Sequence, residues 1–312
     1  MLVLNKAGVP QDVEFATKPQ IALAQIARLI EQGAPRHCVL ADAGYGVDTA
    51  FRAGLSELGL PYAVGVTGAV TVWPPGHAPL PPQPYSGRGN VPTRLRLGDA
   101  KHERPLSIKE LAFDLAPPQW QTIEWREGSN FTLRSRFARV RIRAAHREHQ
   151  RTQQRGEEWL LIEWPEGHKE PMKYWLSTLA EDVALERMVF EAKMRWRIER
   201  DYQDLKQEVG LGQFEGRGWR GLHHHASLSI AAYGFLMAQQ LRHPDGVGKK
   251  NAARREEPAL PTHYKPRGSP AQRTQRHVPS SITTLRLRIA AALLRTLPRC
   301  PCCLRVNPRL RL

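Results

Sequence analysis

Several features that would place this 312-residue chain in a familiar class are missing from its sequence. It contains no run of about 18 apolar residues that could cross a membrane. The segment from Met1 to Pro10 lacks the charged start, apolar stretch and small-residue cleavage site of a signal peptide. Its four cysteines, three of them crowded at Cys300, Cys302 and Cys303, do not make the disulfide framework of a secreted protein in a chain this long. We therefore expect a cytoplasmic protein with reduced thiols.

Acidic residues are too few to balance the basic ones. The chain has 46 Lys and Arg against 30 Asp and Glu, a net charge of +16, and an isoelectric point near 10.2. Most of the excess lies at the end, because residues 243–312 carry 15 Lys and Arg against 3 Asp and Glu. Cations that neutralise phosphates release condensed counterions, so a polyanion is the first partner to consider. Nucleic acid fits this charge best.

The same C-terminal segment is rich in Pro and Gly up to Pro279, which predicts an extended or disordered linker. A helix should follow, capped by Ser280 or Ser281 and stopped by Pro298. Its apolar residues recur at near-helical spacing: Ile282, Leu285, Ile289, Leu293 and Leu294.

The first 66 residues alternate between helix and strand patterns. A helical pattern opens at Pro19, and the run Cys38–Ala41 is typical of a buried strand that ends at Asp42. Asp48 can cap a second helix, and residues 62–66 form another buried strand. Such alternation predicts an α/β layer with parallel strands.

From residue 67 to about 180 the pattern becomes β-rich, after a proline-rich loop. Strands are expected where Trp, Ile, Leu and Tyr are concentrated or where apolar residues alternate with Arg: residues 137–144, 158–164 and 173–177. Residues 181–242 return to a helical pattern. The β-rich segment, residues 67–180, is therefore predicted as an insertion between two parts of an α/β domain.

One helical segment groups charged and aromatic residues on a single face. Four residues fall within about 60° of one another around the helix: Arg195, Glu199, Tyr202 and Lys206. A carboxylate is thus flanked by two cations along one stripe. In an arbitrary basic helix, such a stripe is most often a solvated row of ion pairs.

Motifs around this stripe favour a different interpretation. Arg195, Glu199 and Lys206 match the R-x3-E-x6-K part of the Y-R-E-K motif of DDE transposases in the insertion sequence four superfamily. Ala192 stands where that motif has Tyr. The segment Leu40–Gly46 resembles the strand-end D-x-x-Y-G of the same family. Other segments resemble the group named after insertion sequence seven-zero-one, so the resemblance extends along the chain from residue 7: residues 7–10, 15–19, 210–225 and 297–301.

This resemblance implies an α/β, ribonuclease-H-like fold with a β-rich insertion and a basic, partly disordered C-terminal tail. It also implies that Asp42 and Glu199 are catalytic carboxylates that bind Mg²⁺ or Mn²⁺. Phosphodiester transfer needs hard oxygen ligands on rigid elements, so that two ions about 4 Å apart hold the attacking and leaving oxygens. A strand end and a helix face meet that need.

The implied partner is double-stranded DNA, at the transposon ends and at the target. We expect Arg195 and Lys206 to position phosphates beside Tyr202. Trp125 lies in the insertion, where relatives place a Trp that stacks on a flipped base, although most of the eight Trp residues should be in the core. The oligomeric state stays open, with a homodimer on DNA as one arrangement.

The resemblance also implies that the family's first catalytic Asp lies on a strand well upstream of the segment matching Ala7–Pro10. We therefore expect an N-terminally truncated chain that lacks the first strands of the catalytic domain and does not cleave DNA. The main alternative is a non-catalytic DNA-binding protein that occupies transposon ends and competes with full-length transposase. A stand-alone nuclease of the same fold and an RNA-binding accessory protein are further alternatives.

Two other groups could bind a metal ion by their composition, the histidines His223–His225 and the three C-terminal cysteines. Neither has a second, suitably spaced set of ligands in the sequence. We favour a phosphate-contacting or partly buried helical role for the histidines.

Overall fold

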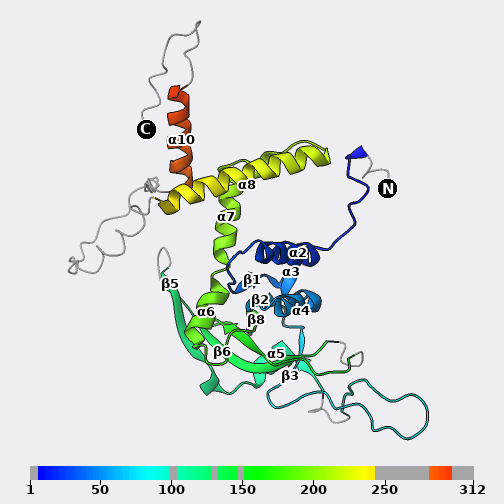
Figure 1. The fold of residues 1–312 in the computed structure, drawn as a ribbon. Coiled ribbons are helices and arrows are strands. Elements are labelled where there is room, and N and C mark those ends of the chain that lie inside the picture. The colour runs from blue at the N-terminus through cyan, green and yellow to red at the C-terminus, as the bar shows by residue number, and fades with distance from the viewer. Residues whose placement is uncertain (1–5, 99–103, 128–131, 147–150, 243–280, 297–312) are drawn as a thin grey trace, which may run out of the picture. The chain divides into compact units, whose positions relative to one another are not determined.

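The computed structural model describes residues 6–98, 104–127, 132–146, 151–242 and 281–296. The chain forms two compact units, one of residues 14–197 and one of residues 1–13 and 198–312 (Figure 1). The first unit carries the sheet, and the described part of the second is helical. The predicted linker before Pro279 and the cysteines Cys300, Cys302 and Cys303 lie outside the described residues.

The first unit begins with the predicted alternation of helix and strand. Its first elements are α2 (Lys18–Glu31), β1 (Val39–Ala41), α3 (Ala43–Gly46), α4 (Thr49–Glu57) and β2 (Tyr62–Val66). Thr17 and Gln20 form a capping box at the start of α2, and Asp48 caps α4 by accepting from two backbone N–H groups. β1 and β2 pair in parallel, which confirms the predicted α/β layer.

The remaining strands continue the same mixed sheet. They are β3 (Thr71–Trp73), β4 (Leu106–Ser107), β5 (Gln121–Glu127), β6 (Thr132–Ala144), β7 (Glu158–Trp164) and β8 (Lys173–Ser177). The strand order is β1-β2-β8-β7-β6-β3-β4, and β5 pairs with β6. Because β8 pairs antiparallel with β2, the β-rich segment extends the α/β layer edge to edge. The three strands predicted in it are confirmed.

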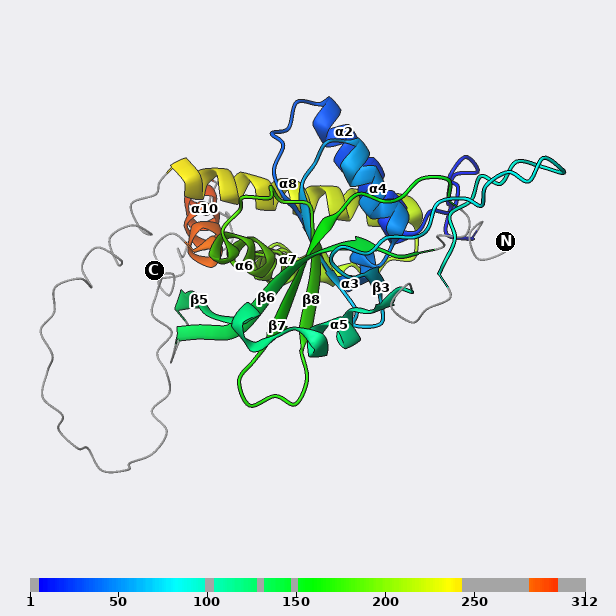
Figure 2. The same ribbon diagram turned by 90° about the horizontal axis from the view of Figure 1, so that it is seen from below.

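Helices cover both faces of this sheet (Figure 2). Residues of α2, α4 and α5 (Ile108–Asp114) pack with Val140 and Ile142 of β6 on one face. On the other face, α6 (Leu185–Lys193) packs against Phe137 of the same strand. The period-two alternation of a strand sends neighbouring side chains to opposite faces, so β6 contributes to both cores.

The arginines that alternate along β6 have partners within the protein. Arg139 donates to the carbonyl of Val183 and lies over the Trp159 ring at 4.6 Å. Arg141 and Arg143 form ion pairs with Glu157, at 3.7 and 3.1 Å. These guanidinium groups therefore tie loops to the sheet.

The described helices of the second unit are the short η4 (Leu211–Gln213), α8 (Trp219–Arg242) and α10 (Ile282–Thr296), together with α7 (Trp196–Gln207), whose first two residues belong to the first unit. Ser281 caps α10 by accepting from the backbone N–H of Thr284, as predicted. Arg286 of α10 forms an ion pair with Glu208 at 3.2 Å. Among the helices of the described residues, none combines the length and apolar character that crossing a membrane requires.

Candidate active site

Asp42 lies at the carboxyl end of β1, where the sequence motif predicted a catalytic carboxylate. It is the N-cap of α3: its Oδ1 accepts from the backbone N–H of Gly44 at 2.9 Å. Its carbonyl oxygen accepts from the N–H of Gly46 at 2.8 Å. Asp42 is exposed, and Oδ2 has no hydrogen-bond partner among the described residues. The backbone thus fixes one carboxylate oxygen and leaves the other open to a ligand.

The glycine that ends this motif is required by packing. A Cβ atom added at Gly46 would lie 2.0 Å from the carbonyl oxygen of Gly65 and 3.1 Å from the Cβ of Val64. A Cβ added at Gly65 would lie 3.2 Å from the backbone N of Ala43. Because neither residue has a side chain, α3 lies directly against β2, and this contact fixes the position of the turn that carries Asp42.

The next helix holds α3 from the other side. Arg52 of α4 is 5% exposed and donates to the carbonyl oxygen of Gly46. The rings of Tyr45 and Phe51 pack with centroids 5.8 Å apart. Arg52 was not predicted as a functional residue, although an Arg on the apolar face of a short helix was an available signal.

The second motif lies on α7, which begins at Trp196. Glu199 is in its first turn and is exposed, and the Lys206 Nζ lies 4.4 Å from the centroid of the Tyr202 ring. Arg195 lies in the turn immediately before the helix, and the predicted four-residue face stays a prediction. Glu199 and Asp42 belong to different units, and their approach across 157 residues stays a prediction.

The position that departs from the family motif is buried. Ala192 on α6 is 4% exposed and packs in the cluster that contains Phe137 and Trp175 of the sheet. A Tyr side chain would have to displace these neighbours. The small residue is therefore explained by the packing of α6 on the sheet.

Trp125 packs in the same region. Its ring is partly buried, meets the Phe137 ring edge-on at 5.6 Å, and lies 4.2 Å from the Nζ of Lys193. These contacts occupy part of the ring, and its stacking on a flipped base stays a prediction.

A buried ion pair anchors α6 at this place. The Nζ of Lys193 lies 2.6 Å from each carboxylate oxygen of Glu163 on β7, and the two side chains are 13% and 6% exposed. Burial lowers the pKa of the Lys193 ammonium, and Glu163 opposes that shift. This ion pair was not predicted, although a Glu within the apolar run of β7 was a signal for a buried partner.

The histidines of α8 have separate neighbours. His225 contacts the carbonyl oxygen of Gly210 at 2.9 Å, and the His223 ring lies 4.1 Å from the Trp219 ring. His224 lines a pocket of about 820 Å³ formed with Gly8 and neighbouring residues. Within the described ranges, no group of three His, Cys, Asp or Glu side chains is placed to hold a metal ion.

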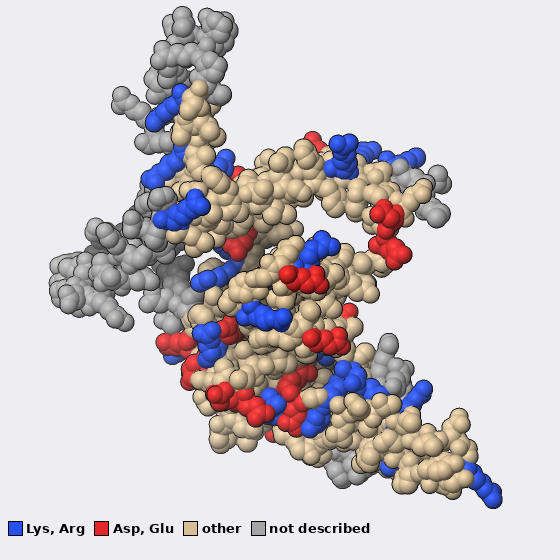
Figure 3. Space-filling model, in the orientation of Figure 1, with Lys and Arg blue, Asp and Glu red and all other residues tan. Residues whose placement is uncertain are grey.

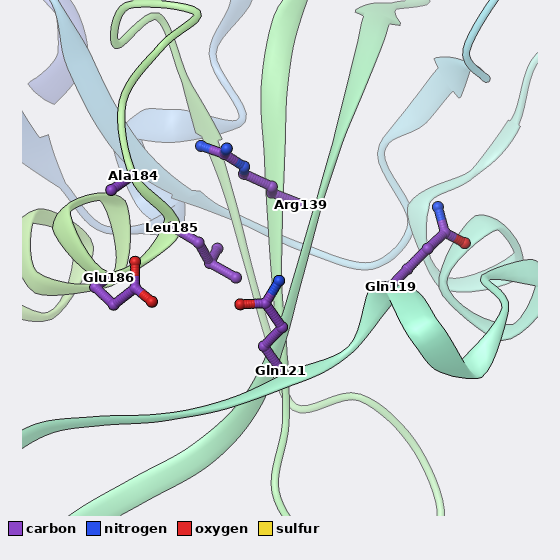
Figure 4. Close-up of a pocket in the computed structure, with 6 residues that line it drawn as sticks. All are labelled: Gln119, Gln121, Arg139, Ala184, Leu185 and Glu186. Atoms are coloured by element: carbon purple, nitrogen blue, oxygen red, sulfur yellow. The ribbon is translucent and has the colours of Figure 1, made fainter.

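On the face drawn in Figure 3, Lys and Arg are interspersed with Asp and Glu. A pocket of about 450 Å³ lies beside the start of α6 and is shown in Figure 4. Its lining consists of Gln119, Gln121, Arg139, Ala184, Leu185 and Glu186. The cationic side chain of this lining is Arg139, whose guanidinium already donates to the carbonyl of Val183 and lies over the Trp159 ring.

No curated protein matches the chain. A family model described as DDE superfamily endonuclease matches residues 3–132, a range that includes β1, Asp42 and α3. The eight-stranded mixed sheet with its helices agrees with a ribonuclease-H-like DDE fold. The matched range covers less than half of the chain, and over it the chain is similar to the DDE superfamily endonucleases.

Proposed function

We propose that this protein is a DDE-type DNA transposase that acts on transposon-end DNA by metal-dependent cleavage and strand transfer. The observation that carries the proposal is the Asp42 carboxylate. It lies exposed at a strand end, in the segment that matches the DDE endonucleases, and a helix turn packed on β2 fixes its position.

The donor atoms suit a hard divalent cation. Mg²⁺ and Mn²⁺ prefer carboxylate oxygens, and Asp42 has one oxygen that is not used by its cap. Asp42 and Glu199 would hold the ions. When bound, such ions stabilise the charge that develops on a transferring phosphoryl group and generate the attacking hydroxide.

The protein's own residues would position the DNA. Lys206 and Arg195 would bind phosphates of the backbone, since ammonium and guanidinium groups form charge-assisted hydrogen bonds with phosphate oxygens. The Lys206 ammonium lies over the ring of Tyr202, which is 51% exposed, and a cation–π interaction with the ring face would hold it there. Gly46 and Arg52 would hold α3, and hence Asp42, in place.

A second candidate is a non-catalytic DNA-binding protein that occupies transposon ends. It is favoured by the capping role of Asp42, because a residue that caps α3 has a structural reason to be present without any metal. The two candidates share the same basic charge and differ in cleavage.

The experiment uses the purified chain with Mg²⁺ or Mn²⁺ and DNA that carries the ends of its own element. Nicking at the ends that is lost in Asp42→Asn and in Glu199→Gln and retained in Glu186→Gln, an exposed carboxylate on α6, would support the transposase and would refute the sequence-based expectation that this chain does not cleave DNA. Asn caps a helix as well as Asp does, so Asp42→Asn should keep the fold. End-specific binding without nicking would establish the second candidate, and neither binding nor nicking would refute both.

A further inference from the structure

A pocket of about 400 Å³ lies between α4 and the segment that leads into β7. Its walls come from Thr49, Arg52 and Ser56 on α4 and from Arg151 and Arg155 on the facing segment. Tyr62 and Glu158 also line it. This size is within the range of sites that enclose a small ligand or one group of a larger one. All of these residues belong to the first unit, and the pocket does not include Asp42.

The facing segment, residues 151–156, is held in place by hydrogen bonds to the rest of the unit. The carbonyl oxygen of Arg151 accepts from the N–H of Leu95 at 2.9 Å. The Gln154 amide donates to the carbonyl of Pro79 at 3.0 Å. An Nη of Arg155 donates to the carbonyl of His146 at 3.1 Å. The two arginines are therefore fixed beside the pocket before any ligand arrives, which lowers the entropy cost of binding.

The pocket has more cationic side chains than anionic side chains that lack an ion pair outside it. Three arginines line it, and the carboxylate of Glu157 is already paired with Arg141 and Arg143 of β6. Glu158 is 7% exposed and accepts from the Tyr62 hydroxyl at 2.8 Å, and Arg52 and Arg155 face it. Burial raises the pKa of the Glu158 carboxyl, and the facing Arg52 and Arg155 oppose that shift.

Arginine donors remain available for a ligand. Arg151 uses Nε on the carbonyl oxygen of Gln153, at 3.2 Å, and its two Nη groups have no hydrogen-bond partner among the described residues. Such a planar pair of donors matches two oxygens of a phosphate group.

We propose that this pocket binds a phosphate group, held chiefly by Arg151 and Arg155 against the buried Arg52. The phosphate belongs either to a DNA backbone or to a small molecule such as a nucleoside monophosphate. The inference does not rest on the proposed transposase function, because binding of phosphate here needs neither Asp42 nor a metal ion.

The test measures binding of inorganic phosphate, adenosine monophosphate and a short DNA duplex to the full chain, with chloride at matched ionic strength as reference. Arg151→Gln and Arg155→Gln should each weaken phosphate binding about ten-fold or more, since a charge-assisted hydrogen bond of about 1.4 kcal/mol corresponds to ten-fold. The matched control is Arg94→Gln, which removes an exposed arginine of the same unit that does not line the pocket. Arg52 is left unchanged, because it is buried in the fold.

Each outcome of these binding measurements supports or overturns the inference that the pocket binds phosphate. Weaker binding of phosphate and duplex in both variants identifies a DNA backbone phosphate, and weaker binding of phosphate and the nucleotide alone identifies a small phosphate ligand. Phosphate binding no tighter than chloride, or losses equal to those of Arg94→Gln, would overturn the inference. Circular dichroism of each variant shows that a loss of binding does not arise from unfolding.

Discussion

Replacing Gly46 by Ala should destabilise the first unit and displace the catalytic candidate Asp42. The new Cβ would lie 2.0 Å from the carbonyl oxygen of Gly65, whereas real Cβ atoms essentially never come within 3.0 Å of such an atom. The obstacle is backbone of β2, which is paired on both sides by β1 and β8 and cannot turn away as a side chain would. α3 must therefore move outward by about 1 Å, and overpacking of this kind costs about 1–3 kcal/mol.

The Gly→Ala change also has a stabilising effect, which partly offsets the cost of overpacking. Gly→Ala stabilises a protein by about 0.4–1 kcal/mol when the backbone is compatible, because it restricts the unfolded chain. Gly46 is not among the positive-φ glycines, so this gain applies. With a rigid neighbour, the overpacking cost should be near its upper bound, and we expect a net loss of about 2 kcal/mol.

Urea unfolding followed by tryptophan fluorescence measures this difference. Gly156→Ala is the matched control, because a Cβ added there meets nothing within 4 Å. Gly65→Ala should lose less stability than Gly46→Ala, since its nearest atom is 3.2 Å away. A Gly46→Ala protein as stable as the control would show that α3 does not pack against β2 as described.

Three further predictions concern buried ionisable groups. Lys193→Met should lower the free energy of unfolding by about 3–5 kcal/mol, because it leaves the Glu163 charge buried without its partner. Adding Glu163→Gln should restore most of this loss in the same urea assay. A double variant no more stable than Lys193→Met would contradict this prediction. Burial raises the pKa of Glu158 above its ordinary value of 4.5, so its protonation stabilises the fold fully below pH 4.5, and this contribution is lost as the pH rises through the raised pKa. The stability of the native protein relative to Glu158→Gln should therefore fall as the pH rises from 4.5, and a difference that does not change with pH would refute it. Burial raises the pKa of the Cys38 thiol to about 12, so iodoacetamide should label Cys38 far more slowly in the folded protein than in urea. Mass spectrometry of the Cys38 peptide measures the two labelling rates. Equal rates would show that the folded protein has an accessible thiolate.

Local patterns in the sequence predicted many individual elements. The helices capped by Thr17, Asp48 and Ser281, the parallel strands β1 and β2, and the strands β7 and β8 follow from capping residues and apolar runs that lie next to one another in the chain. Strands β3, β4 and β5 were not predicted. β3 and β4 have only three and two residues, too few to show a strand periodicity. They form strands because β3 pairs with β6 and β4 pairs with β3.

The sequence by itself predicted which residues could do chemistry, because the spacing of D-x-x-Y-G and of R-x3-E-x6-K is a local property. It placed Asp42 at a strand end and Glu199 on a helix. Only the tertiary structure decided that β8 continues the sheet from β2, and that Gly46 meets Gly65. It also decided that Lys193 is enclosed with Glu163, and that Arg52 shares a pocket with Arg155. The three residue pairs lie 19 to 103 positions apart in the sequence, and their contacts depend on how strands and helices pack, which no local periodicity encodes.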